Sequence, residues 1–262
     1  WVCRSDNTSI DVIKKLIEVG GRELLMVQAD NNKRRHPFLL TYNMKEVAVK
    51  TLIEEGIRLS LGGEFSIGGL FNCCTTTDDN GNTNHDRDNP CQIQFYEQRW
   101  NDSILPAFKN EELHALLNDQ PILHAAVIGK APLNVIQDII THFPQSVTFQ
   151  DSAGRHAIDV AVEEGLKWED GLEVIVGQFA NAQGQTVMNV ASYYGVEWNG
   201  GMEEVVEANK EQIGIVDDVT NLYPFMLAAV GDTLRNYDWN TAYNLIKRRP
   251  DVVKFYTYST PI

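Results

Sequence analysis

Residues 73–91 hold the side chains best suited to metal chemistry. Cysteine thiolates and histidine imidazoles are ligands that zinc prefers, and this stretch supplies Cys73, Cys74, His85 and Cys91. The first two cysteines are adjacent, however, and the short spacers usual between paired zinc ligands are absent. We interpret the stretch as a solvated insertion rich in Asp, Asn and Thr, and expect no metal or other cofactor.

The same stretch imitates the first half of a calcium-binding loop. Asp78, Asn80 and Asn82 fall at alternate positions, as the first oxygen ligands of such a loop do. The sixth position is Thr83, where the loop needs a glycine for its sharp turn, and the twelfth is Asn89, where a glutamate closes the site. Calcium binding is therefore not expected.

The rest of the chain shows no pattern typical of catalysis or phosphate binding. The glycines of 62–69 are not followed by the Lys and Ser or Thr of a phosphate-binding loop. The histidines form no spaced metal motif, and His124 is interpreted as a structural residue. No Gly-x-Ser-x-Gly sequence is present, and acidic pairs such as Glu163 and Glu164 are expected in solvent at helix ends. The sequence therefore does not predict an enzyme.

Charge and composition limit the classes of partner. The 262 residues carry a formal net charge of −14, which argues against nucleic acid and anionic membrane surfaces. Hydrophobic residues make up 43% of the chain, enough for a buried core, but no apolar run approaches the ~18 residues of a membrane span. Four cysteines without a disulfide framework favour an intracellular, cytoplasmic protein. The sequence begins at Trp1 and shows no secretory signal, and it leaves open whether a targeting segment precedes Trp1.

The elements that would position functional residues follow a repeat. In four segments a small alanine lies four residues after an anchor residue, and a glycine follows. The anchors are Pro121, Ala157, Val187 and Pro224; the alanines are Ala125, Ala161, Ala191 and Ala228; the glycines are Gly129, Gly165, Gly195 and Gly231. The anchors lie 36, 30 and 37 residues apart, a spacing typical of helical repeat arrays.

Each segment has recognisable flanks. A turn signal, Asp or Asn followed three residues later by Gly or Asn, precedes the last three anchors, at 151–154, 181–184 and 218–221. Downstream, apolar residues recur at helical spacing and predict second helices with one buried stripe. These stretches are 133–140, 172–179, 202–208 and 239–246. Pro144 and Pro250 predict where two of these helices end.

One longer motif occurs twice: Gly, two residues, Trp, two residues and Gly occupy 165–171 and again 195–201. Trp168 and Trp198 therefore share one position in successive units, and Trp239 has a related place in the last unit. The repetition favours a packing role, in which each ring covers its own helix pair and touches the next unit. Contact with a partner is the alternative.

These features together resemble the ankyrin repeat. The family pattern is Asp-x-x-Gly-x-Thr-Pro-Leu-His-x-Ala-Ala-x-x-Gly, and the stretches 120–129, 151–165 and 223–231 match parts of it. The Thr-Pro pair is nowhere complete, and residues such as Leu123 and Asp159 replace the histidine, so we expect a divergent array with distorted hairpins. The stretches 57–70 and 222–232 also resemble divergent ankyrin-type proteins common in some unicellular algae.

The resemblance implies an all-α, ankyrin-like helical-hairpin solenoid with short turn or hairpin connections and one irregular insertion. Residues 1–57 would form N-terminal units, the first of them truncated. Residues 58–114 would form a Gly-, Asp- and Asn-rich insertion with one helical unit. Residues 115–262 would form four further units and a tail. Neighbouring units would bury jointly the apolar stripe that one helix pair cannot bury alone.

The resemblance also implies a non-enzymatic protein–protein interaction module that binds one or more proteins. The contacts expected from it are the turn tips, with Ala153, Arg155, Gln183, Gln185 and Asn221, and outward positions of the first helices, with Tyr193 and Tyr194. A structural subunit packed permanently into a larger assembly is the alternative. An enzyme or metal-binding protein that uses 73–91 is less favoured.

Overall fold

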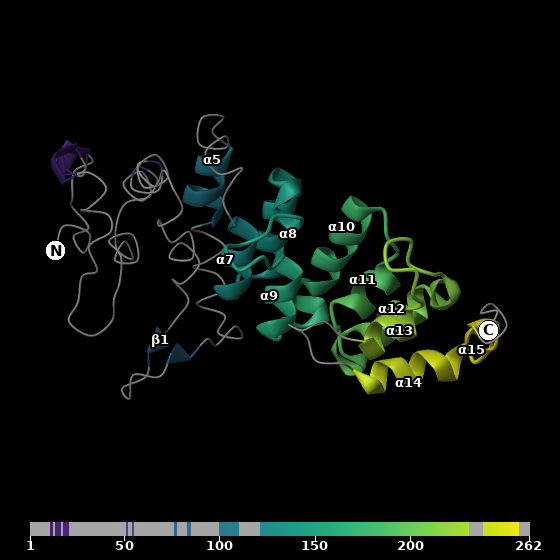
Figure 1. Cartoon of the computed structure of the whole chain (residues 1–262). Helices are drawn as coiled ribbons and strands as arrows, with labels where there is room; N and C mark the ends of the chain where they lie inside the picture. Colours follow the sequence, from purple (N-terminus) through teal and green to yellow (C-terminus); the bar gives the residue numbers. More distant parts are fainter. Residues whose placement is uncertain are drawn as a thin grey trace. The chain divides into compact units, whose positions relative to one another are not determined.

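The computed structural model describes mainly the second half of the chain (Figure 1). The described residues are 11–12, 14–16, 18–20, 51, 54, 76–77, 83–84, 100–109, 121–230 and 238–256. They are mostly helical, which confirms the all-α prediction. The contacts divide the chain into two compact units, Trp1–Ser146 and Val147–Ile262, which are described separately below. The domain boundaries proposed at 57 and 114 stay predictions.

In the first unit, helix α7 (Ile122–Ile128) packs against α8 (Leu133–His142). Before them lie a short turn of helix, η4 (Trp100–Ile104), and α5 (Leu105–Phe108). Trp100 is fully buried, and its indole Nε1 donates a 2.7 Å hydrogen bond to Asp138 of α8. In the few described residues of the predicted insertion, β1 (Thr76–Thr77) pairs antiparallel with β2 (Thr83–Asn84), and Thr77 lies opposite Thr83.

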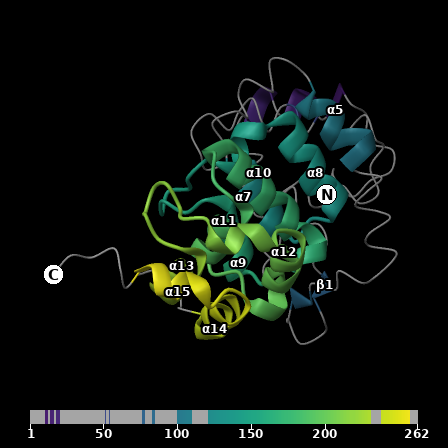
Figure 2. The same cartoon turned by 90° about the vertical axis from the view of Figure 1, so that its right-hand side faces the viewer.

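Within the described residues of the second unit, six α-helices belong to the repeat and one more follows them. They are α9 (Ala157–Glu163), α10 (Glu173–Gln183), α11 (Val187–Tyr193), α12 (Met202–Ala208), α13 (Pro224–Val230), α14 (Trp239–Arg248) and α15 (Asp251–Tyr256). Shorter turns of helix are η6 (Trp168–Leu172), η7 (Trp198–Gly200) and η8 (Lys210–Gly214). Contacts join α9 to α10, α10 to α11, α11 to α12 and α13, and α13 to α14. Both views show α14 alongside α13 (Figures 1 and 2).

Two of the first helices, α9 and α11, end in the same way, as the alanine and glycine pattern predicts. In α9 the carbonyl of Ala161 accepts a hydrogen bond from the Leu166 amide, and in α11 that of Ala191 accepts one from the Val196 amide. Between them, Gly165 and Gly195 adopt positive φ values of 64° and 71°, which glycine tolerates without strain. This C-terminal cap turns the chain toward the second helix.

The first copy follows the same geometry one residue later than the sequence alignment predicts. Helix α7 starts at Ile122 rather than at Pro121, and the Ala126 carbonyl accepts the bond from Ala131. The residue with positive φ is Lys130, at 53°, and not Gly129, whose φ is −73°. The pairing of Ala125 and Gly129 with Ala161 and Gly165 is therefore wrong by one residue, because the left-handed residue after α7 is a lysine and not the neighbouring glycine.

The corrected alignment moves the third residue of each first helix. His124 in α7, Asp159 in α9 and Asn189 in α11 now occupy the same position, and all three are buried. The prediction that Leu123 stands there is thus wrong. The carboxylate of Asp159 accepts a 2.9 Å bond from the His156 backbone amide and so stabilises the start of α9. In α11 the capping side chain is Thr186 instead, whose hydroxyl accepts a bond from the backbone amide of Asn189.

The connections between copies differ. A tight turn was predicted at 181–184, but residues 181–183 still belong to α10, and Gly184 caps that helix with a φ of 67°. Only residues 184–186 therefore separate α10 from α11, which explains the short interval of 30 residues in this part of the sequence. The two helix ends predicted from prolines are confirmed, since α8 ends at His142 and α14 at Arg248, each two residues before a proline.

The interior of the second unit is built from the predicted apolar stripes. Ile158 and Ala161 of α9, Ile175 and Phe179 of α10, and Val190 of α11 are each no more than 3% exposed. Burying a valine, isoleucine or phenylalanine side chain contributes about 1.5–3 kcal/mol. Small alanines between the larger residues allow the helices to approach closely. Within the described residues, every helix is too short or too polar to cross a membrane.

Candidate interaction sites

An aspartate organises the turn that precedes α9. The Asp151 carboxylate accepts 2.9 Å bonds from the amides of Ala153 and Arg155, and bonds of 3.0 and 2.8 Å from the Arg155 guanidinium. Gly154 completes the turn with a φ of 77°. Arg155 also donates to Glu163 at the C-terminal end of α9, at 2.6 Å, so one arginine joins the turn to the far end of the helix.

A second aspartate organises the turn that precedes α13. The Asp217 carboxylate accepts bonds from the amide and the hydroxyl of Thr220, at 2.8 and 2.7 Å. Its other oxygen accepts a 2.7 Å bond from the Gln185 side chain, which comes from the start of the preceding copy. Asn221 has a positive φ of 58° and donates its amide to the Asp217 carbonyl. The turn is therefore braced both internally and from the neighbouring copy.

Both aspartates are held in the ionised form. Burial alone would raise the pKa of Asp151, but hydrogen bonds from Arg155 and Ala153 outweigh it and lower that pKa below its ordinary value. Burial would likewise raise the pKa of Asp217, and the bonds from Thr220 and Gln185 lower it instead. The negative charge of each aspartate is thus stabilised by the hydrogen bonds that hold its turn.

Most of the residues predicted to bind a partner lie at or near these turns. Ala153 and Asn221 are exposed at the tips, and Gln183 is exposed at the end of α10. Arg155 and Gln185 are half-buried, and each is already engaged with an aspartate of its turn. Tyr193, at the end of α11, is 38% exposed.

Tyr194 lies elsewhere than predicted. It was placed at an outward position of α11, but it is 5% exposed, and its hydroxyl forms a 3.1 Å hydrogen bond with Nδ1 of His156. Its ring packs edge-on against Phe179 of α10, with 5.2 Å between the ring centroids. The prediction that Tyr194 faces outward is therefore wrong. Tyr194 follows the last residue of α11, and the turn of the chain there directs its side chain inward.

Two apolar residues of the second turn are exposed although the sequence pattern does not predict them as contact residues. Val219 is 78% exposed at the tip and Ile215 is 42% exposed at its base. An apolar residue between the polar neighbours of 217–221 was the available signal, since a turn tip gives a valine nothing to pack against. We call Ala153, Gly154, Val219 and Asn221 the turn tips.

The repeated tryptophan motif forms a second site at the other end of the first helices. Gly171 and Gly201, its last residues, adopt nearly the same φ, 128° and 130°. The Trp168 ring lies directly on Gly201, where a Cβ would come within 2.4 Å of a ring carbon. Trp198 is 7% exposed and lies under the guanidinium of Arg248, 5.0 Å from the ring centroid.

These contacts support the predicted packing role for two of the three tryptophans. Trp168 of the first motif copy contacts Gly201 of the second copy, and Trp198 contacts Arg248 of α14. Trp239 differs from both, because it is the first residue of α14 and is 66% exposed. Trp239 thus stands at the start of a second helix, as the sequence predicts, but its exposed ring does not share the packing role of the other two.

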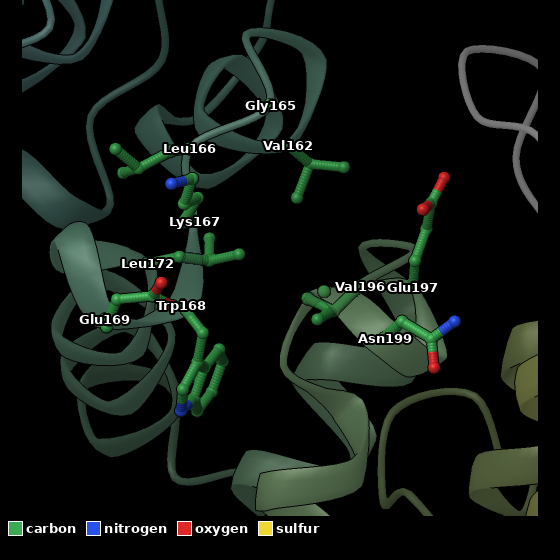
Figure 3. A pocket seen from close by; sticks show the side chains of 11 residues that line it. Val162, Gly165, Leu166, Lys167, Trp168, Glu169, Leu172, Val196, Glu197 and Asn199 are labelled. Carbon is green, nitrogen blue, oxygen red and sulfur yellow. The ribbon is translucent and has the colours of Figure 1, made fainter. Parts of the chain in front are cut away.

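A pocket of about 410 Å³ lies between the two motif copies, and we call it the Trp168 pocket (Figure 3). Side chains from 166–172 line one side, and those of Val196, Glu197 and Asn199 line the other. Leu166, Leu172 and Val196 are buried, whereas the charged lining residues Lys167, Glu169 and Glu197 are exposed. The pocket thus has an apolar interior and a charged rim.

Metal chemistry finds no support in the part of the chain that the structure describes, where no group of three His, Cys, Asp or Glu residues could hold an ion. The candidate zinc ligands and the aspartate and asparagines of the calcium-like loop lie outside the described residues. No family model, curated protein or solved structure matches the chain.

Proposed function

We propose that the chain is a non-enzymatic protein-interaction module, built as a divergent ankyrin-like solenoid. Three first helices, α9, α11 and α13, each have seven residues. The main contacts between helices join the two helices of one copy or helices of adjacent copies. A stack of helix pairs produces contacts of this kind, because each pair meets only its neighbours. The sequence resemblance to ankyrin repeats supports the same arrangement.

The observation that carries the function is the bracing of the two turns. Each turn is held by several hydrogen bonds to one buried or half-buried aspartate, while Ala153, Val219 and Asn221 at the tips remain exposed. Loops that are ordered before binding lose less conformational entropy when a partner arrives. Exposed residues on such loops are well suited to recognise another protein, and an intracellular, cytoplasmic setting remains part of the proposal.

The test compares partners captured by two matched variants. Ala153→Glu with Val219→Glu changes the tips, and Ala208→Glu with Val253→Glu changes an alanine and a valine exposed elsewhere. We expect affinity capture with mass spectrometry to recover the same proteins with the wild type and the control, and at least about tenfold less with the tip variant. Equal recovery by the tip variant would contradict the proposal.

A single stable complex of fixed composition would favour the structural-subunit alternative. Light scattering on the chain purified from its native source distinguishes the two, because a module exchanges partners whereas a subunit stays in one assembly.

A further inference from the structure

The Trp168 pocket is a surface separate from the turn tips. The braced turns precede α9 and α13, whereas the pocket residues follow the C-terminal ends of α9 and α11. A helix of seven residues is ~10 Å long. A partner segment held at the turn tips therefore leaves the pocket open to a different segment.

The lining of the pocket indicates what kind of ligand it fits. Its buried side chains, Leu166, Leu172 and Val196, are all aliphatic, and the Trp168 ring adds an aromatic wall. Each lining residue with a charge or an amide is exposed at the rim. A small polar ligand needs polar groups placed inside its pocket, whereas an apolar side chain that anchors a longer segment needs an apolar interior and a polar rim.

The rim carries more negative than positive charge. The lining includes two glutamates, Glu169 and Glu197, and one lysine, Lys167. Glu164 and Glu173 are exposed and adjoin lining residues in the sequence. The whole chain has a formal net charge of −14, which adds a long-range attraction for cations. A segment that enters the pocket would meet this rim with the residues on either side of its anchor.

We propose that the Trp168 pocket binds a basic segment of a partner protein. One aliphatic or aromatic side chain occupies the pocket against Trp168 and Leu172, and lysines or arginines beside it meet Glu169 and Glu197. The inference deepens the proposed interaction function and rests on it, but it concerns a different surface from the turn tips.

Labelled peptides test the ligand chemistry. A fluorescein-labelled peptide with a central leucine and two lysines on each side should bind the full chain, and fluorescence anisotropy measures its affinity. Replacing the lysines with glutamates should abolish binding, because the rim repels them. Replacing the leucine with serine should weaken binding at least about tenfold, as expected when a leucine loses its burial. Equal binding of the lysine and glutamate peptides would overturn the proposal.

Charge-reversal variants test the place of binding. Glu169→Lys with Glu197→Lys changes the rim, and Glu204→Lys with Glu211→Lys changes the net charge equally at exposed residues outside the pocket. We expect about a tenfold loss of affinity for the lysine peptide in the first variant and about twofold in the second. The same loss in both variants would show that the peptide only senses the net charge, which would overturn the inference.

Fluorine NMR on the chain labelled with 5-fluorotryptophan gives a direct readout. The Trp168 signal, assigned with Trp168→Phe, should shift when the lysine peptide is added, and the Trp198 signal should stay in place. A peptide that leaves Trp168 unmoved while the tip variant loses its partners would refute this inference and preserve the proposed function. A peptide that shifts Trp168 while the tip variant keeps every partner would support the pocket and remove the role of the turn tips.

Discussion

The two copies of the tryptophan motif have the same backbone but different surroundings. In both, the last glycine has a φ close to 130°, and the tryptophan precedes the second helix by a short helical turn. Trp198 is covered by Arg248 and is almost fully buried, whereas Trp168 rests on Gly201 with one side toward an open pocket. The motif therefore determines the local backbone conformation. The neighbouring copy determines whether the tryptophan ring is buried in the core or is accessible to a ligand.

The largest effect is expected from removing the covered ring. Trp198→Ala should lower the free energy of unfolding by about 3–5 kcal/mol, because a buried tryptophan leaves a large cavity. Trp168→Ala should cost less, about 1–3 kcal/mol, since its ring is only half-buried. Chemical denaturation followed by circular dichroism measures both. Equal losses would contradict the difference between the two copies.

The next effect tests the contact that joins the copies. Gly201→Ala should destabilise the chain by about 2–4 kcal/mol, because the new Cβ meets the Trp168 ring and an alanine is strained at a φ of 130°. Gly200→Ala is the matched control. Its Cβ would lie 3.5 Å from Glu197, an ordinary contact, so its unfolding midpoint should stay close to that of the wild type.

The aspartates of the two turns should differ in their effects at neutral pH. Asp217→Asn should lower the free energy of unfolding by about 2 kcal/mol, and Asp151→Asn by about 1 kcal/mol, since Asp217 is 2% exposed and the Asp151 side chain 15%. The same denaturation series at pH 7 measures this. If Asp151→Asn costs more, then the brace from Gln185 adds little to the second turn.

The pH dependence of these variants has a definite sign. The pKa of Asp217 is lowered by folding, so its contribution is present above the ordinary carboxyl pKa of ~3.9 and is lost as the pH falls through the folded value. The stability difference between wild type and Asp217→Asn should therefore shrink below about pH 4. A difference that stays constant from pH 7 to pH 3 would contradict this account.

The smallest effect concerns the cover of Trp198. Arg248 stacks on this ring and also pairs with Glu203 and Glu207. Arg248→Met should cost about 1 kcal/mol, because exposed ion pairs contribute little and the methionine still covers part of the indole. The Trp198 fluorine signal should move while that of Trp168 stays unchanged. A change at Trp168 instead would mean that the two copies are coupled through this residue.

Much of the described chain from residue 121 onward could be predicted from periodicity. The apolar spacing located the second helices, and Pro144 and Pro250 located two of their ends, because both signals are local. The glycines at 165 and 195 marked caps correctly for the same reason. The alignment of the first copy failed because Lys130 adopts a conformation that a glycine usually takes, and sequence alone does not show the exception.

The candidate sites were harder to predict because they depend on contacts between copies. Gln185 was expected to face a partner, but it binds Asp217, 32 residues away. Tyr194 was expected to face outward, but His156 and Phe179 hold it in the interior. The Trp168 pocket could not be anticipated, since it arises only where residues 162–172 meet residues 196–200. The repeat pattern gives the position of a residue within its own unit but not its neighbour in the next.

The contact of the Trp168 ring with Gly201 affects how such a chain can lengthen during evolution. Residues 157–186 include both a tryptophan that rests on the following unit and, in Gly171, a glycine with the backbone conformation that receives such a ring. A gene duplication of this block would therefore place a compatible ring and glycine at the new junction without any further mutation. Copying this block would therefore lengthen the chain while reusing the same tryptophan–glycine contact between neighbouring copies.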